Sequence, residues 1–286
     1  MESIKSFSTM ETNWQGVSYD EIDVPEPLYK FREWRKSQHK TILTEQIVYL
    51  SPPSGFEDPL DCKNPVRFDL RSHREQNKRF FDESVRRHPH WSKKRHKKFA
   101  KYWMKRTPIR NPEKLKQKQR ESDAMFDKVF GVFCLTPVAE NFELWEKYAD
   151  DHKGFCVGFS GKELLSDFSK FGMSGHVNYY PKLPIIHPNE DFKDKANKRA
   201  FSKLEKWSFE REYRTTKIKP DGEVGNDWRK VKVPSERFVE VVFGANMPEE
   251  NKQEIIQLAN GNFPNVKFKQ AEIDAKNKTV TIKDLF

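Results

Sequence analysis

Three short apolar runs constrain the fold of this 286-residue chain more than any other feature. They cover residues 129–135, 154–159 and 238–244, and each has the length of a strand. Apolar runs this short are typical of strands buried on both faces, because a buried helix needs about 10 residues or more. Stretches with helical periodicity separate the runs. We therefore predict an α+β fold with a split, mixed sheet.

Weaker patterns supply the other expected elements. Short strands are expected at residues 28–32, 46–50, 177–180, 207–214, 266–273 and 279–282. Helices are expected at residues 34–43, 140–148, 192–206 and 248–259. Residues 1–24 are expected to form an irregular lead-in.

Cysteine and glycine usage excludes several classes of protein. Cys62, Cys134 and Cys156 lie far apart and form no C-x-x-C pair, which argues against a zinc knuckle or a secreted disulfide framework. The first 25 residues lack the pattern of a signal peptide, and no apolar run approaches the roughly 20 residues that span a bilayer. Neither a phosphate-loop nor a Rossmann glycine pattern occurs. We expect a cytoplasmic protein that does not bind a membrane.

A basic segment covers residues 71–120 of a chain with net charge +10. Phe99, Tyr102 and Trp103 lie among its bases at helical spacing, so we expect helices with an aromatic stripe and a basic face. A basic face favours nucleic acid as the partner. The alternative is an ordinary helical excursion that packs its aromatic side chains on the core. The predicted nucleic-acid-binding residues are Arg86, Arg87, Lys93, Lys94, Arg95, Lys97, Lys98 and Lys101.

Five segments carry a family resemblance that spans the chain from Leu28 to the C-terminus. They cover residues 28–32, 48–61, 144–156, 206–214 and 241–245. In this order and spacing they resemble the bacterial family of domains of unknown function numbered 2971. Glu57 stands where the resemblance leads us to expect Asn. The basic segment matches least and is interpreted as an insertion, and the family name implies no activity.

The pair Glu210-x-Glu212 is the strongest candidate for a site. On the strand predicted at residues 207–214, side chains two apart point to the same face, so the carboxylates lie together while Arg211 and Tyr213 point away. Like charges on one face are costly unless they meet a cation, a ligand or a substrate hydroxyl. The alternative is a solvent-facing strand edge whose carboxylates pair with Arg211, Arg214 or nearby lysines.

An E-x-E pair on a late strand, with an aromatic or basic residue on an early strand, is similar to the arrangement in ADP-ribosyltransferases. That resemblance implies NAD as substrate and Glu212 as the catalytic carboxylate that stabilises an oxocarbenium-like transition state. It implies that Glu210 prepares the acceptor and that Tyr29 and Arg32 bind the cofactor. Tyr29 stands where that superfamily has an early Arg or His.

Other residues allow two interpretations each. Trp145 and Tyr148 share a helix face and either pack in the core or stack on the nicotinamide or adenine ring of the cofactor. Asp58 and Asp61 either bind a metal or, as is typical beside a proline, form a turn, and we expect no metal. His152 is either a general acid or base or a turn residue, which is the more typical role.

These patterns predict a single catalytic domain over residues 1–286, with a fold resembling that of ADP-ribosyltransferases and a basic, mostly helical insertion at about residues 71–125. The expected function is an NAD-dependent toxin or phage-defence effector that transfers ADP-ribose to RNA or DNA, with an antitoxin protein as a further partner. Two alternatives remain. One is a non-catalytic nucleic-acid-binding module, and the other is a metal-dependent nuclease. The nuclease would use Asp58, Asp61, Glu210 and Glu212.

Overall fold

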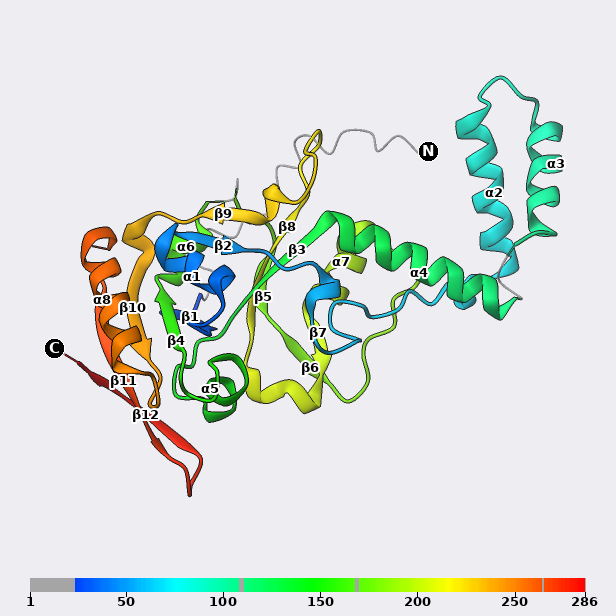
Figure 1. Ribbon diagram of the computed structural model, residues 1–286. Helices are drawn as coiled ribbons and strands as arrows, with labels where there is room; N and C mark the ends of the chain where they lie inside the picture. Colours follow the sequence, from blue (N-terminus) through cyan, green and yellow to red (C-terminus); the bar gives the residue numbers. More distant parts are fainter. Residues whose placement is uncertain (1–23, 108–110, 168–169, 264, 286) are drawn as a thin grey trace.

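A five-stranded mixed sheet forms one end of the molecule in a computed structural model, which describes residues 24–107, 111–167, 170–263 and 265–285 (Figure 1). The strand order is β1-β4-β10-β11-β12, and only β10 and β11 run parallel among these neighbours. The strands are β1 (Leu28–Arg32), β4 (Phe155–Phe159), β10 (Phe238–Phe243), β11 (Lys267–Asp274) and β12 (Thr279–Asp284). The chain is therefore α+β with a mixed sheet, as the apolar runs predict.

Both faces of this sheet are covered. On β4, Phe155, Val157 and Phe159 pack into one cluster with residues of α1 (Ser37–Thr44) and α8 (Glu249–Asn262). Cys156, on the opposite face, packs into a second cluster with residues of α5 (Phe142–Tyr148) (Figure 1). The two-residue repeat of the strand produces this division, and it explains why β4 is apolar throughout.

A second, three-stranded sheet has the order β3-β8-β5 and is antiparallel. Its strands are β3 (Phe130–Leu135), β8 (Tyr213–Ile218) and β5 (Ser174–His176). The backbone amides of Tyr29 and Thr136 donate to each other's carbonyl oxygens at 2.8 and 3.0 Å, which joins β1 to the end of β3. The two sheets therefore meet at β1. The sheet predicted to be split is thus divided between β1 and the end of β3.

Two small sheets and two further helices complete the body. The small sheets pair β2 (Ile47–Tyr49) with β9 (Lys230–Lys232) and β6 (Asn178–Tyr180) with β7 (Ser202–Leu204). The helices are α6 (Gly161–Leu165) and α7 (Phe192–Ala200). Among the described residues, no helix combines the length and the apolar character that crossing a bilayer requires.

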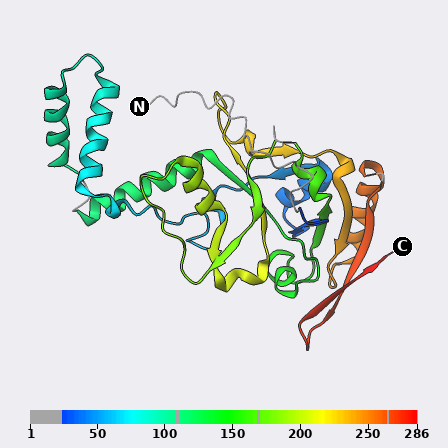
Figure 2. The same cartoon turned by 180° about the vertical axis from the view of Figure 1, so that it is seen from behind.

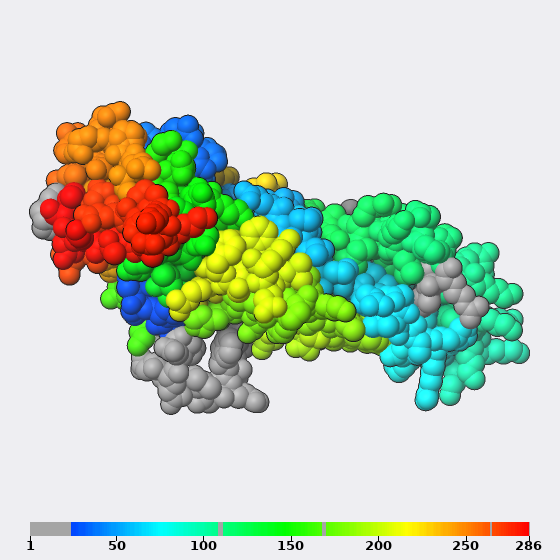
Figure 3. Space-filling view, turned by 90° about the horizontal axis from the view of Figure 1, so that it is seen from below, coloured from blue at the N-terminus to red at the C-terminus, as the bar shows by residue number. Residues whose placement is uncertain are grey.

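The basic insertion is helical, as predicted, and forms the other end of the molecule (Figures 1 and 3). Helices α2 (His73–Arg87) and α3 (Lys93–Met104) form a hairpin that stands away from the body, and α4 (Pro112–Val129) connects it to β3 (Figure 2). We call the α2–α3 hairpin the arm. Of the predicted aromatic stripe, Phe99 contacts Trp91 and Trp103 contacts Phe80 within the hairpin, whereas Tyr102 is exposed. The stripe therefore does not pack on the protein core, as the alternative supposed.

Two predicted elements were wrong in part. The helix expected at residues 192–206 begins as predicted but ends at Ala200. The first half of the strand expected at 207–214 is instead part of a 3-10 helix, η5 (Glu205–Glu210). Arg211 follows with a left-handed φ of 44°, and β8 begins only at Tyr213. A few residues of alternating polarity fit a strand and a three-residue turn almost equally well, so the pattern could not separate them. The lead-in expected at 1–24 lies, apart from Val24, outside the described residues.

Candidate active site

A cleft opens where β1, β3, α5, η5 and the loop after β2 meet. Its cavity volume is about 230 Å³. The cleft draws on four of the five segments that carry the family resemblance, so residues far apart in the sequence converge there. Its polar and aromatic lining includes Tyr29, Lys30, Arg32, Tyr49, Phe56, Glu57, Asp58, Asp61, Lys147, Tyr148, Lys203, Trp207, Glu210 and Glu212.

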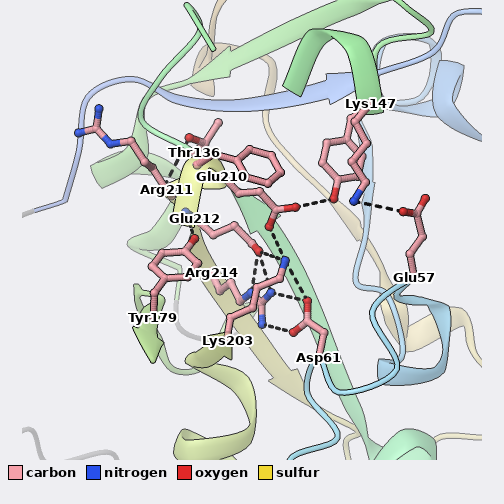
Figure 4. Close-up of polar contacts among 12 residues, drawn as sticks. Glu57, Asp61, Thr136, Lys147, Tyr179, Lys203, Glu210, Arg211, Glu212 and Arg214 are labelled. Carbon is pink, nitrogen blue, oxygen red and sulfur yellow. Dashed lines mark hydrogen bonds and ion pairs between the residues drawn. The ribbon is translucent and has the colours of Figure 1, made fainter. Parts of the chain in front are cut away.

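The ammonium group of Lys203 lies at the centre of the polar cluster (Figure 4). Its Nζ is 2.6 Å from Oε1 of Glu212 and 3.2 Å from Oδ2 of Asp61, and it also contacts Oε2 of Glu210. Strand β7 presents Lys203, and η5 follows it directly, so a short stretch of chain supplies both the cation and Glu210. All four side chains are buried.

Arg214 closes the cluster from β8. Its guanidinium makes two 2.8 Å bonds to the carboxylate of Asp61 and bonds of 2.7 and 2.9 Å to that of Glu212. Paired contacts of this kind are the strongest that a carboxylate makes in proteins. Three carboxylates thus face two cations, so full ionisation would leave one negative charge in a buried place.

The two glutamates respond to this imbalance in opposite ways. Burial opposes the charged form of Glu212, but the charges of Arg214 and Lys203 outweigh it and hold its pKa well below the usual range. Burial, followed by the hydrogen bond and charge of Glu212, raises the pKa of Glu210 from 4.5 to about 7, and Lys203 only partly offsets this. Glu210 is therefore placed to take up or release a proton near neutral pH.

Tyr148 completes the surroundings of Glu210. Its phenol donates a 2.7 Å hydrogen bond to Oε1 of Glu210. Burial and the charge of Glu210 raise the pKa of this phenol, so it stays protonated and keeps donating. Tyr179 accepts a 2.9 Å bond from the backbone amide of Glu212, which fixes the chain between the two glutamates.

The predicted convergence of Glu210 and Glu212 is found, but for a different reason. Glu210 ends η5 and Glu212 immediately precedes β8, so strand alternation does not bring them together. The left-handed backbone at Arg211 turns the chain, and its side chain points away from the cluster (Figure 4). The alternative of a solvent-facing edge is wrong, because Glu210 and Glu212 are only 2% and 7% exposed.

Basic side chains line another part of the cleft. Lys30 and Arg32 are two residues apart on β1, and both line the cavity. The Nζ of Lys30 donates a 2.7 Å bond to the carbonyl of Cys134, and burial, with a smaller contribution from Arg32, lowers its pKa to about 8. At the rim, Lys147 pairs with Glu57 at 3.2 Å. Glu57, the residue that departs from the family pattern, thus forms part of the cleft mouth.

Tyr29 lines the cleft, but its hydroxyl is already engaged. It donates a 2.7 Å hydrogen bond to Oε1 of Glu240, which sequence reasoning missed because Glu240 lies in a run interpreted as apolar core. The pair requires Gly158 beside it, since a Cβ there would lie 2.7 Å from Glu240 and 3.1 Å from the Tyr29 ring. Of the two predicted cofactor residues on β1, Arg32 is the one with a charged group at the cavity.

The two aromatic residues predicted to bind the cofactor, Trp145 and Tyr148, lie in different surroundings. Trp145 is fully buried, donates its indole N–H to the carbonyl of Ala139 at 2.7 Å and does not line the cleft. The expectation that its ring stacks on a cofactor is therefore wrong, and the core alternative is confirmed. Tyr148 does line the cleft, as does Trp207, whose ring lies 3.9 Å from the Nζ of Lys147. Trp207 was missed although it lies in a segment that carries the resemblance.

His152 lies in a turn, as its more typical role predicts. Asp150, Asp151 and His152 all have positive φ, and the imidazole is buried against Phe142 and Trp145. Burial lowers its pKa. It does not line the cleft, so the geometry gives it no place in the chemistry there.

The residues of the nuclease alternative come together only in part. Asp61 lies with Glu210 and Glu212 around Lys203. Asp58 instead accepts a 3.2 Å hydrogen bond from the backbone amide of Leu60, which is typical of a turn residue. Within the described ranges, no group of His, Cys, Asp or Glu has an arrangement suited to a metal ion. An ammonium group already lies among the three converging carboxylates. The expectation of no metal stays a prediction.

Part of the chain that lines the cleft matches a known family model. Residues 144–215 match the family model described as Protein of unknown function (DUF2971). This confirms the predicted resemblance over two of its five segments, 144–156 and 206–214, while the other three lie outside the match. The matched range contains Tyr148, Lys203, Glu210, Glu212 and Arg214. No curated protein and no solved structure matches the chain. The resemblance to ADP-ribosyltransferases stays a prediction.

Proposed function

We propose that the cleft binds NAD, cleaves the bond between nicotinamide and ribose, and passes ADP-ribose to an acceptor. One observation carries the proposal. A carboxyl with a pKa of about 7, Glu210, lies beside the ionised Glu212 in a cleft that the cations Lys30 and Arg32 also line. A perturbed acid in a cleft with charges of both signs suits a ligand that has ribose hydroxyls and phosphates.

The size of the cleft suits part of the ligand. At about 230 Å³ the cavity is smaller than the roughly 300–1,000 Å³ typical of pockets that enclose a drug-sized molecule. We therefore place the nicotinamide and its ribose inside, against Tyr148 and Trp207. The pyrophosphate would lie at Lys30 and Arg32, and the adenosine half outside.

The chemistry follows from the charges. When the glycosidic bond breaks, its electron pair leaves with nicotinamide and the ribose carbon becomes positive. The excess negative charge of the cluster stabilises that carbon. Ionised Glu210 takes the proton of the attacking hydroxyl as the new C–O bond forms, with Tyr148 holding its carboxylate. This revises the roles predicted from sequence, because Glu212 becomes the residue that holds Lys203 and Arg214 in position.

An enzyme that consumes NAD in the cytoplasm is harmful to its own cell unless it is controlled. We therefore retain the role of a toxin or phage-defence effector with an antitoxin protein as partner. All three cysteines are free thiols, as in a reducing compartment. The nuclease is less favoured, because Lys203 lies where a divalent cation would be needed.

Release of nicotinamide tests the proposal. Glu210→Gln should lower the rate about a hundredfold or more, the scale found when a group that stabilises a transition state is removed. Glu205→Gln is the matched control, because Glu205 is exposed on the same 3-10 helix, and it should leave the rate unchanged. A wild-type protein that releases no nicotinamide with RNA, DNA, protein or water as acceptor would contradict the proposal.

A further inference from the structure

The two helices of the arm carry their charges differently. On α2, Lys78 pairs with Asp82, while Arg86 and Arg87 both pair with Glu83. Of the predicted nucleic-acid-binding residues, Arg86 and Arg87 thus lie on α2, whereas the lysines that follow lie on α3. Three of the five Lys and Arg residues of α2 thus pair within the helix, and Arg74 and Arg79 leave it net basic.

Helix α3 has no acidic residue. With 3.6 residues per turn, the lysines between positions 94 and 105 fall on the side opposite His96 and Ala100, which are buried against α2. These lysines are exposed, and among the residues that the structure describes none has an ion-pair partner. We call them the lysine face. Its members are Lys94, Lys97, Lys98, Lys101 and Lys105.

Such a face favours a partner with regularly spaced negative charge. Like charges one turn apart repel each other, and an external polyanion removes that repulsion while releasing counterions. Tyr102, which is 51% exposed, lies at the edge of the lysine face with the guanidinium of Arg106 3.7 Å from its ring. An exposed ring beside lysines offers a base a surface to stack on, which an acidic protein or a lipid headgroup would not use.

Helix α4 sets the distance between the lysine face and the cleft. Its 18 residues extend about 27 Å at about 1.5 Å per residue, and it runs directly into β3, which lines the cleft. A mononucleotide cannot contact both places. A strand that advances about 3.4 Å per nucleotide needs roughly eight nucleotides to do so.

We propose that the lysine face binds the phosphate backbone of a nucleic-acid strand, and that the same strand reaches the cleft as the acceptor of ADP-ribose. The second statement rests on the proposed function, whereas the first does not. The acceptor is accordingly a polymer of about eight nucleotides or more, rather than a free nucleotide.

Binding is measured by fluorescence anisotropy with 20-nucleotide single-stranded RNA, single-stranded DNA and duplex DNA, and with polyglutamate as a non-nucleic polyanion. Between about 50 and 200 mM salt, affinity for a single strand should fall with a log-log slope of about 0.7 per neutralised phosphate. Replacing Lys94, Lys98 and Lys101 by Glu should weaken binding at least about tenfold and reduce that slope by about 2, which is three contacts at 0.7 each.

The matched control replaces Lys232, Lys267 and Lys276 by Glu, which changes the net charge equally at exposed positions of the body. It should alter affinity less than about twofold, because surface charges away from the contact act only through weak, screened interactions. Equal losses in both triple variants, equal affinity for polyglutamate, or no binding to any of the nucleic acids would overturn the assignment of the lysine face.

Oligonucleotides of 5 and 20 nucleotides test the link to the cleft. With NAD, wild-type protein should modify the 20-mer, and the variant of the lysine face should modify it far less while still releasing nicotinamide to water. Equal modification of both lengths, unaffected by the variant, would overturn the bridging strand. Binding without any nicotinamide release would instead contradict the proposed function and leave the lysine face in place.

Discussion

The polar cluster of the cleft and the lysine face of the arm use the same kinds of side chain under opposite conditions. In the cleft, Lys203 and Arg214 are buried, and each contacts two or more carboxylates. On α3 the lysines are exposed and unpaired within the described residues. A buried charge must be matched by its own protein, whereas an exposed charge is solvated and remains available to a partner. The comparison therefore separates charges that are matched within the fold from charges that remain available to a partner.

Arg214→Met should produce the largest effect. It removes the guanidinium that holds Asp61 and Glu212, and leaving buried charges unpaired typically costs about 3–5 kcal/mol. The free energy of unfolding is measured by urea titration. Arg211→Met serves as control, because the Arg211 side chain points away from the cluster (Figure 4) and should change stability by less than about 0.5 kcal/mol. Equal losses of stability in both variants would show that the buried Arg214 holds the fold no more than the exposed Arg211 does.

Glu210→Gln should change how stability depends on pH. An acid whose pKa rises from 4.5 to about 7 on folding binds more protons in the folded chain, so its effect on stability becomes less favourable as pH rises through that window. The Gln side chain of the variant does not titrate, so the variant does not lose stability in this way. Its free energy of unfolding relative to wild type should rise by on the order of 3 kcal/mol between pH 4.5 and 7, and level off above.

Comparing the variant with wild type reports mainly on Glu210. The lowered pKa of Glu212 acts in the other direction, since its contribution is present above pH 4.5 and lost as pH falls, and the charges of Arg214 and Lys203 that chiefly lower it remain in the variant. Glu205→Gln, on the exposed side of η5, should reproduce the wild-type profile. A difference between wild type and Glu210→Gln that does not vary with pH would show that folding does not raise the pKa of Glu210.

Lys97→Ala and Lys101→Ala should have the smallest effect. Exposed charges without partners contribute little to folding, so stability should change by less than about 0.5 kcal/mol. Alanine also has the highest helix propensity and relieves the repulsion between lysines one turn apart, so the double variant should be slightly more stable at low salt. Thermal unfolding at two salt concentrations checks this. A loss above about 1 kcal/mol would mean that the lysine face holds the fold as well.

Much of the body could be predicted because its strands are short and strongly apolar. Strands β3, β4 and β10 appear where the three runs predict them, and the basic insertion is helical. The fold of residues 205–212 could not be predicted, because it combines a left-handed backbone at Arg211 with contacts of Glu210 and Glu212 to Lys203. Local polarity carries no information about such contacts.

The candidate site was predicted in part. The E-x-E spacing pointed to Glu210 and Glu212, and the sequence also offered Asp61 in the nuclease alternative and Arg214 as an ion-pair partner. Lys203, which contacts all three carboxylates, was not identified. Lysines are frequent in this sequence, so no spacing marks Lys203 as the buried one. Trp145 was assigned to the cofactor because a face of a helix does not show whether it turns to a cleft or to the core.

Helix α4 passes into β3 without an intervening loop, since Phe130 both caps the helix and begins the strand. Phe126 stacks on Phe130 at 4.4 Å, which stiffens the junction. Each residue added to α4 would rotate its far end by about 100° around the helix axis and advance it by about 1.5 Å. The start of α2 is also bonded to the body, where Arg71 donates to the side chain of Asn189 at 2.9 Å and Asn189 donates to Glu75 at 2.7 Å. The length of α4 is thus matched to a second attachment of the arm, and an inserted residue would set the two attachments against each other.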